Sequence, residues 1–266
     1  MNKLFYFLFT ISILISCQKV INVDLNEANP NIVIEGIYTT EDSTVRVKIS
    51  LTSSYFNSSA STIVDGADVS ITDFSGLTTN IPYIGNGIYE IENYIPIFNS
   101  TYTLNVTNDG VTYSAQCDLT DIVPLNDITY ELFPGFFGED GGYVVYLNFN
   151  DPINITNHYQ IVLSLNGEEF SDLNETFTQD DIFTDGNPVS RPLFLNDFFQ
   201  ENDTIGMELR SIDKDIYYYL NEAISIVGAN GASAAAPANP NSNWNNNALG
   251  YFSAYGNSRK ETIIIP

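Results

Sequence analysis

The sequence predicts a mainly β protein, in which an antiparallel Ig-like or carboxypeptidase-regulatory-like β-sandwich is followed by a second β-rich domain with one helix. Three observations predict this class. The composition is 44% hydrophobic and 13% aromatic but only 16% charged, and Thr, Val, Ile, Tyr and Phe suit pleated sheets. Apolar and polar residues alternate with a period of two over many short runs. Asp-Gly and Asn-Gly pairs, which favour tight hairpins, separate these runs.

The first residues are typical of an export signal. Lys3 precedes an apolar stretch, Leu4–Ile15, that is too short to cross a hydrocarbon core of ~30 Å. This stretch ends in Leu14-Ile15-Ser16-Cys17, which resembles the bacterial lipobox, in which the Cys becomes the acylated N-terminus. We therefore predict a lipoprotein signal peptide over residues 1–16 and lipidation of Cys17, with an ordinary signal peptide and a chance Cys as the alternative.

A lipidated tether is expected over residues 17–30, because several acyl chains on Cys17 would anchor the chain stably. In the tether, Lys19 is followed by Val20, so an acidic signal for surface export is incomplete. We expect a lipid-anchored protein of the outer membrane, and we favour the cell surface over the periplasmic face although this export signal is incomplete.

The N-terminal β-sandwich domain is expected over residues 31–121. Its alternation is clearest over residues 43–51, where Val45, Val47, Ile49 and Leu51 share one side. Cys117 is the one Cys left after signal cleavage, so it cannot form an internal disulfide. It is expected to be a buried inert thiol, with a reactive thiol as the alternative. The remaining strands of this domain are expected over residues 31–39, 67–71, 88–91, 102–106 and 111–117.

The C-terminal β-rich domain is expected over residues 122–266, with the boundary near 121–124. Its strands are expected over 143–149, 158–165 and 204–209, and closing strands over 249–255 and 262–265. The helix near 213–228 begins after Asp213, a suitable N-cap, and has apolar residues on one face. A low-complexity loop follows over 229–247, of a kind that is either functional or disordered.

Charge and composition exclude several classes of function. The chain has 9 Lys and Arg against 33 Asp and Glu, a formal net charge of −24, so we expect no nucleic-acid partner. One His and two Cys disfavour zinc, iron–sulfur and most His-based catalysis. His158 is expected to be structural or solvent-facing rather than a general base. No catalytic motif is found, and no carboxylate pair of a glycosidase can be singled out among so many acids.

Two acidic groups could hold calcium through oxygen ligands. The first contains Asp180, Asp181 and Asp185, which are weak calcium candidates because they lack the Asp-x-Asp-x-Asp-Gly spacing; a solvated loop is the alternative. The second contains Asp197, Glu201 and Asp203 and has the same status. Calcium is thus the one cofactor that the sequence raises.

Aromatic residues in polar loops are candidate contacts for a partner or ligand. Phe133, Phe136 and Phe137 lie in a segment of Pro and Gly that reads as a loop, and either an exposed tip or a packed loop fits. Trp244 lies in the Asn-rich loop, where it could anchor a partner or glycan, or fold back onto the body of the protein.

An ordered set of motifs over nearly the whole chain resembles one family. They are Leu14–Cys17, Ile32–Gly36, Gly66–Ile71, Gly87–Tyr89, Tyr102–Leu104, Asn148–Pro152, Asn157–Tyr159, Ile212–Leu220 and Leu249–Tyr255. Together they resemble the Bacteroidota outer-membrane lipoproteins of the domain-of-unknown-function 4249 family (DUF4249). The resemblance implies genes beside TonB-dependent outer-membrane receptors and an accessory role in uptake or assembly, and it implies no catalytic residues.

Three functions stay open from the sequence. The first is a non-catalytic lipoprotein that docks on a TonB-dependent β-barrel receptor and helps to capture or admit a ligand. The second is a free-standing glycan-binding or carboxylate-based hydrolytic surface lipoprotein. The third is a purely structural surface protein.

Overall fold

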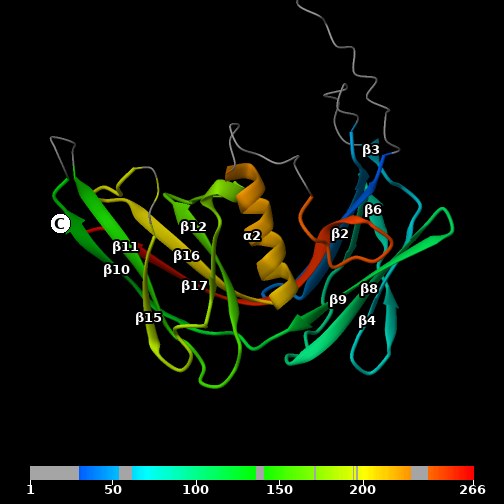
Figure 1. The fold of residues 1–266 in the computed structure, drawn as a ribbon, viewed down its shortest axis with the longest axis horizontal. Helices are drawn as coiled ribbons and strands as arrows, with labels where there is room; N and C mark the ends of the chain where they lie inside the picture. The colour runs from blue at the N-terminus through cyan, green and yellow to red at the C-terminus, as the bar shows by residue number, and fades with distance from the viewer. Residues whose placement is uncertain are drawn as a thin grey trace, which may run out of the picture.

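The computed structural model describes residues 30–53, 62–135, 141–170, 172–193, 195, 197–228 and 239–266. The described chain is mainly β, with one α-helix, and this confirms the predicted fold class. Its strands form two sandwiches that lie side by side (Figure 1). No helix among the described residues combines the length and the apolar character needed to span a membrane.

The N-terminal sandwich packs a four-stranded sheet against part of a ten-stranded sheet. Its core contains Val45, Val47 and Ile49, the side predicted from the period-two alternation. The four-stranded sheet consists of β4 (Asp68–Thr72), β5 (Thr78–Asn80), β8 (Ser100–Asn108) and β9 (Val111–Leu119). The larger sheet here contains β1 (Ile32–Thr39), β2 (Thr44–Leu51), β3 (Thr62–Ile63), β6 (Tyr83–Gly85) and β7 (Ile88–Ile91).

The C-terminal sandwich packs a three-stranded sheet against the other part of the ten-stranded sheet. The three strands are β10 (Leu125–Phe133), β11 (Gly142–Asn150) and β15 (Pro188–Leu193). Facing them are β12 (His158–Leu165), β13 (Glu168–Glu169), β14 (Phe177–Asp180) and β16 (Thr204–Ile212), and the 3-10 helix η2 spans Leu173–Glu175. Strands β10 and β14 lie outside the ranges in which the sequence predicted strands.

Strand β17 (Leu249–Ile263) is shared by the two sandwiches. Its first half pairs with β1 in parallel, with Val33 opposite Leu249, whereas its second half pairs antiparallel with β16. The parallel pair departs from the purely antiparallel arrangement that the hairpin signals predicted. The two closing strands expected over 249–255 and 262–265 form one continuous strand. This strand pairs with strands from both sides of the predicted domain boundary at 121–122. The boundary itself stays a prediction.

Helix α2 (Lys214–Gly228) lies between the two sandwiches (Figure 1). The Asp213 carboxylate accepts hydrogen bonds from the backbone N–H of Asp215, at 2.7 Å, and of Asp118 in β9, at 2.9 Å. The first bond caps the helix as predicted, and the second joins the helix to the N-terminal sandwich. Burial of Ile216, Leu220 and Ala223 fixes the apolar face of the helix.

Candidate functional site

Two turns at one end of the C-terminal sandwich lie side by side (Figure 1). Residues 151–157 join β11 to β12, and residues 181–187 join β14 to β15. Strand pairing places Asn150 opposite Pro188 and His158 opposite Asp180, so both ends of one turn are paired with the ends of the other. Gly186, with φ of +70°, lies so close to Ile153 that an added Cβ would fall 2.8 Å from its Cγ1. The turns therefore form one continuous surface.

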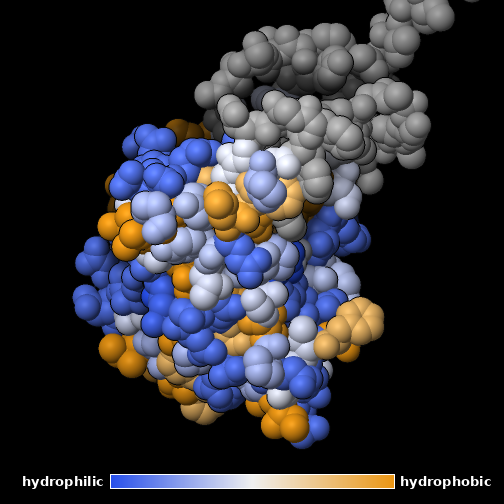
Figure 2. Space-filling model, turned by 90° about the vertical axis from the view of Figure 1, so that its left-hand side faces the viewer, coloured by the Kyte–Doolittle hydropathy of each residue, from blue (hydrophilic) through white to orange (hydrophobic). Residues whose placement is uncertain are grey.

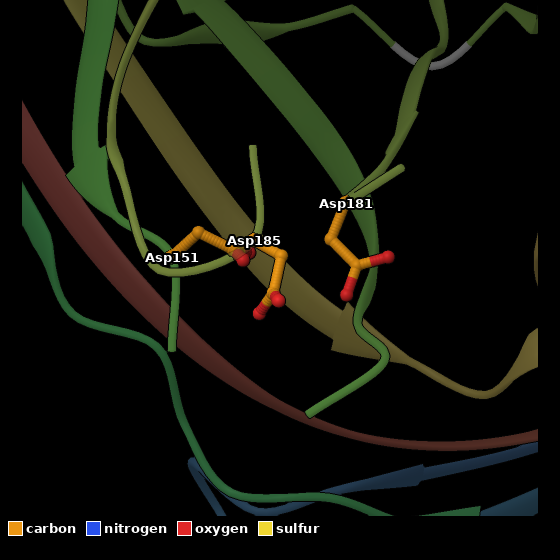
Figure 3. A group of neighbouring side chains, drawn as sticks. All are labelled: Asp151, Asp181 and Asp185. Carbon is orange, nitrogen blue, oxygen red and sulfur yellow. The ribbon is translucent and has the colours of Figure 1, made fainter. Parts of the chain in front are cut away.

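Three carboxylates meet beneath these turns. One oxygen each of Asp151, Asp181 and Asp185 lies within 4.8 Å of the other two. The side chains come from the end of β11 and from the turn after β14 (Figure 3). Asp151 and Asp181 are buried, whereas Asp185 is exposed. We call these three residues the carboxylate trio.

Hydrogen bonds orient each carboxylate of the trio. The Tyr159 hydroxyl donates to Asp151 Oδ1 at 2.6 Å. The two other carboxylates accept backbone N–H groups of the facing turn, Asn157 to Asp181 Oδ2 at 2.8 Å and Asn154 to Asp185 Oδ1 at 2.7 Å. The two bonds from Asn157 and Asn154 also tie the two turns together.

The electrostatics of the trio are unfavourable without a positive charge. Burial raises the pKa of Asp151, and the carboxylates of Asp181 and Asp185 raise it further. The Tyr159 hydroxyl and the Gly186 backbone act in the opposite direction and lower this pKa. Within the described part of the chain, the ion pairs involve Glu35, Glu41, Glu90 and Glu208, and none involves the trio. The trio thus has the donor set of a site for a hard cation.

The structure brings together only part of the predicted calcium group. Asp181 and Asp185 belong to the trio, but Asp180 does not, because its carboxylate accepts the Tyr217 hydroxyl at 3.2 Å. Asp151 was missed because it lies 30 positions before Asp181 in the chain, and the two meet only in the fold, through the pairing of β11 with β15 and of β12 with β14. The Asp-Pro pair directly after a strand was the one local signal. Binding of calcium itself stays a prediction.

Large apolar side chains are exposed on the two turns that bear the trio. Ile153 and Ile155 project from one turn and Ile182 and Phe183 from the other; all four are exposed, Phe183 by 94%. We call these four residues the apolar rim. The two turns lie at the lower edge of the molecule in Figure 1. Figure 2 views the molecule from the left-hand side of Figure 1 and shows separate hydrophobic groups along the lower edge of that face.

Trp244 is not an exposed contact, which corrects one candidate. Its side chain is only 5% exposed and lies in the core of the N-terminal sandwich. The indole N–H donates to the carbonyl oxygen of Ile34 at 3.0 Å, which satisfies the polar atom of the ring inside the core. Of the two alternatives, Trp244 therefore follows the second and folds back onto the body of the protein.

The other candidate contacts are only partly described. Phe133 is the last residue of β10 rather than part of a loop, and its half-buried ring stacks on Phe198 with 5.1 Å between centroids. Phe136 and Phe137 lie outside the described residues, as does Cys17. Their predicted roles stay predictions.

His158 and Cys117 both lie in buried surroundings. His158 begins β12, and its ring packs against Tyr217 at 4.9 Å; burial lowers the pKa of the imidazole. Burial raises the pKa of the Cys117 thiol well above its usual range, and the Ala254 N–H donates to Sγ at 3.1 Å. Both placements agree with the structural alternatives raised for these residues.

Two further charged groups have structural partners. The Asp203 carboxylate accepts the Gln200 N–H and the Asn166 side-chain amide, so it stabilises turns and gathers no metal-binding group among the described residues. Glu208 is buried and pairs with both Arg210 and Arg259, at 2.7 Å each. These arginines neutralise Glu208, whereas the carboxylates of the trio form no ion pair with a described Lys or Arg.

Fold and site define a mainly β protein of two joined sandwiches, with an acidic, apolar-rimmed pair of turns at one end. A family model described as Domain of unknown function (DUF4249) matches residues 18–261. The chain therefore belongs to the DUF4249 family, as the motifs indicated. No curated protein matches it. A solved chain described as "Cytokine receptor complex - Crystal form 1A" is 7% identical, with 86% of this chain and 95% of that chain covered; its TM-score of 0.29 supports no argument.

Proposed function

We propose that this protein is a non-catalytic lipoprotein of the bacterial outer membrane that works as an accessory subunit of a TonB-dependent receptor in ligand capture or uptake. The observation that carries the binding role is the apolar rim. Lipid anchoring rests on the sequence around Cys17, and the choice of receptor rests on the family resemblance.

The apolar rim has the chemistry of an interaction surface. Phe183 is 94% exposed, and the side chains of Ile153, Ile155 and Ile182 lie on the same two turns. Exposed apolar groups that gather in one place mark sites of protein or membrane contact, whereas single ones are ordinary. Burial of such side chains against a partner is favourable by roughly 1.5–3 kcal/mol each.

The position of the rim favours a protein partner over the bilayer. Strand β1 begins near β3 at the top of Figure 1, whereas the turns that bear the rim lie at the bottom. A lipid on Cys17 would hold the chain by the end from which β1 begins. The rim would then point away from the anchored end, toward a neighbouring protein.

The test is a pull-down of the tagged mature protein from detergent-solubilised native outer membranes, read by mass spectrometry. We expect a stoichiometric TonB-dependent β-barrel with the natural chain. A double variant, Ile182→Ser with Phe183→Ser, should lose it. A matched control, Phe74→Ser, changes a residue that is 61% exposed in the N-terminal sandwich and should keep the barrel.

Two outcomes would overturn parts of the proposal. Recovery of the natural chain alone would favour a free-standing binding or hydrolytic module, or a structural protein, and would reject the accessory role. Equal recovery of the barrel by the double variant and the control would reject the rim as the contact. Lipidation is tested separately, because Cys17→Ser should abolish incorporation of labelled fatty acid and release the protein from membranes.

A further inference from the structure

A buried carboxylate oxygen of the trio lacks a partner. Among the described residues, two buried side-chain polar atoms have no hydrogen bond, Asp151 Oδ2 and Thr184 Oγ1. Both belong to the two turns around the trio, and Asp151 is only 4% exposed. Buried polar atoms are normally satisfied, and an unpaired one is costly. A bound cation or an ordered water would supply the partner that Asp151 Oδ2 lacks.

The spacing of the oxygens fits calcium. Calcium binds oxygen at 2.3–2.6 Å, so two oxygens on one ion can lie up to about 5 Å apart. The trio's oxygens lie within 4.8 Å of one another. Magnesium, with bonds of about 2.0–2.1 Å, would require a closer approach. The donor set is all oxygen, without the His or Cys that zinc favours.

The hydrogen bonds leave the second oxygen of each carboxylate for an ion. Tyr159, Asn157 and Asn154 occupy one oxygen each of Asp151, Asp181 and Asp185. These bonds hold the carboxylates in place before any ion arrives, which reduces the cost of ordering them. Calcium takes six to eight ligands, so water or backbone oxygens would complete the shell.

From this geometry we propose that Asp151, Asp181 and Asp185 bind one calcium ion, which joins the turn between β11 and β12 to the turn between β14 and β15. The ion satisfies Asp151 Oδ2 and offsets the repulsion among three carboxylates. Because Asp185 is exposed and the protein supplies few ligands, we expect a dissociation constant of about 0.1–1 mM, as in extracellular modules. This site does not depend on the proposed function.

Calorimetric titration of the full chain in detergent with calcium chloride tests the proposal. We expect one ion per chain and a rise in the unfolding temperature with calcium. Terbium should report the same site, because excited tyrosine transfers energy to nearby terbium and Tyr159 donates directly to Asp151. Calcium should displace the terbium.

Calcium binding by variants of the trio is compared with binding by a variant of a neighbouring acidic residue. Asp151→Asn and Asp185→Asn should each weaken calcium binding at least ten-fold, and Asp180→Asn should leave it unchanged. Asp185 is exposed, so its variant decides the matter even if Asp151→Asn does not fold. No calcium binding by the natural chain at 5 mM, or equal binding by Asp185→Asn and Asp180→Asn, would overturn the proposal.

Discussion

Replacement of Trp244 tests whether the Asn-rich loop completes the N-terminal core. The chain has one Trp, and its side chain lies in the core of that sandwich, with the indole N–H donating to the carbonyl oxygen of Ile34. Trp244→Ala removes the ring and leaves a cavity, which costs about 3–5 kcal/mol for a buried aromatic residue. Trp244→Phe keeps most of the apolar contact but leaves the Ile34 carbonyl without its donor, which costs about 1–3 kcal/mol.

Urea denaturation followed by far-UV circular dichroism measures both losses, because these variants lack the fluorescent residue. The expected order of unfolding free energy is natural chain, then Phe, then Ala. Phe183→Ala is the matched control and should change stability by less than about 0.5 kcal/mol, because that ring is exposed. If Trp244→Ala lay within about 1 kcal/mol of the natural chain at an unchanged slope, the core role of this residue would be refuted.

Three further results are expected. Asp213→Ala should lower the unfolding free energy by about 1–2 kcal/mol in urea denaturation, and Asp213→Asn by less, because Asn also caps helices. In a Cys17→Ser chain, the buried Cys117 thiol should react with a water-soluble maleimide only after unfolding, and fast labelling of the native protein would contradict its burial. Burial raises the pKa of Tyr219 and of Tyr255 to about 12, from the ordinary tyrosine value of about 10, so the folded state keeps protons that the unfolded state releases. Stability should therefore fall as pH rises from about 10 to 12, and phenolate absorbance should appear together with unfolding.

Local patterns predicted most of the secondary structure, because their cause is local. The alternation over residues 43–51 became β2, with Val45, Val47 and Ile49 buried. The pair Asp109-Gly110 has positive φ at both residues, as its hairpin required. Asp213 caps α2. Strand β10 was missed because its outer face is exposed and Pro and Gly follow it, so the alternation is weak.

Contacts between residues far apart in the chain could not be predicted, because a single sequence does not show which distant residues lie together in the fold. Trp244 and Ile34 are 210 positions apart, so the polarity of the loop said nothing about the burial of its Trp. The trio likewise depends on the pairing of β11 with β15, which brings Asp151 to the turn that holds Asp181 and Asp185. Sequence spacing identified two of those three carboxylates and included Asp180, whose partner is Tyr217.

The sharing of strand β17 has a consequence for the order of folding. Strand β1 pairs with β2 along one edge and with residues 249–255 along the other, so its second edge stays unpaired until nearly the last described residues are present. Closing so long a loop costs conformational entropy before any contact repays it, and folding slows as the sequence separation of contacts grows. The N-terminal sandwich should therefore stay incomplete during synthesis, and residues 31–121 expressed alone should lack both a central strand and Trp244. Because β17 belongs to both sandwiches, we expect the two halves of the molecule to unfold together in one cooperative transition.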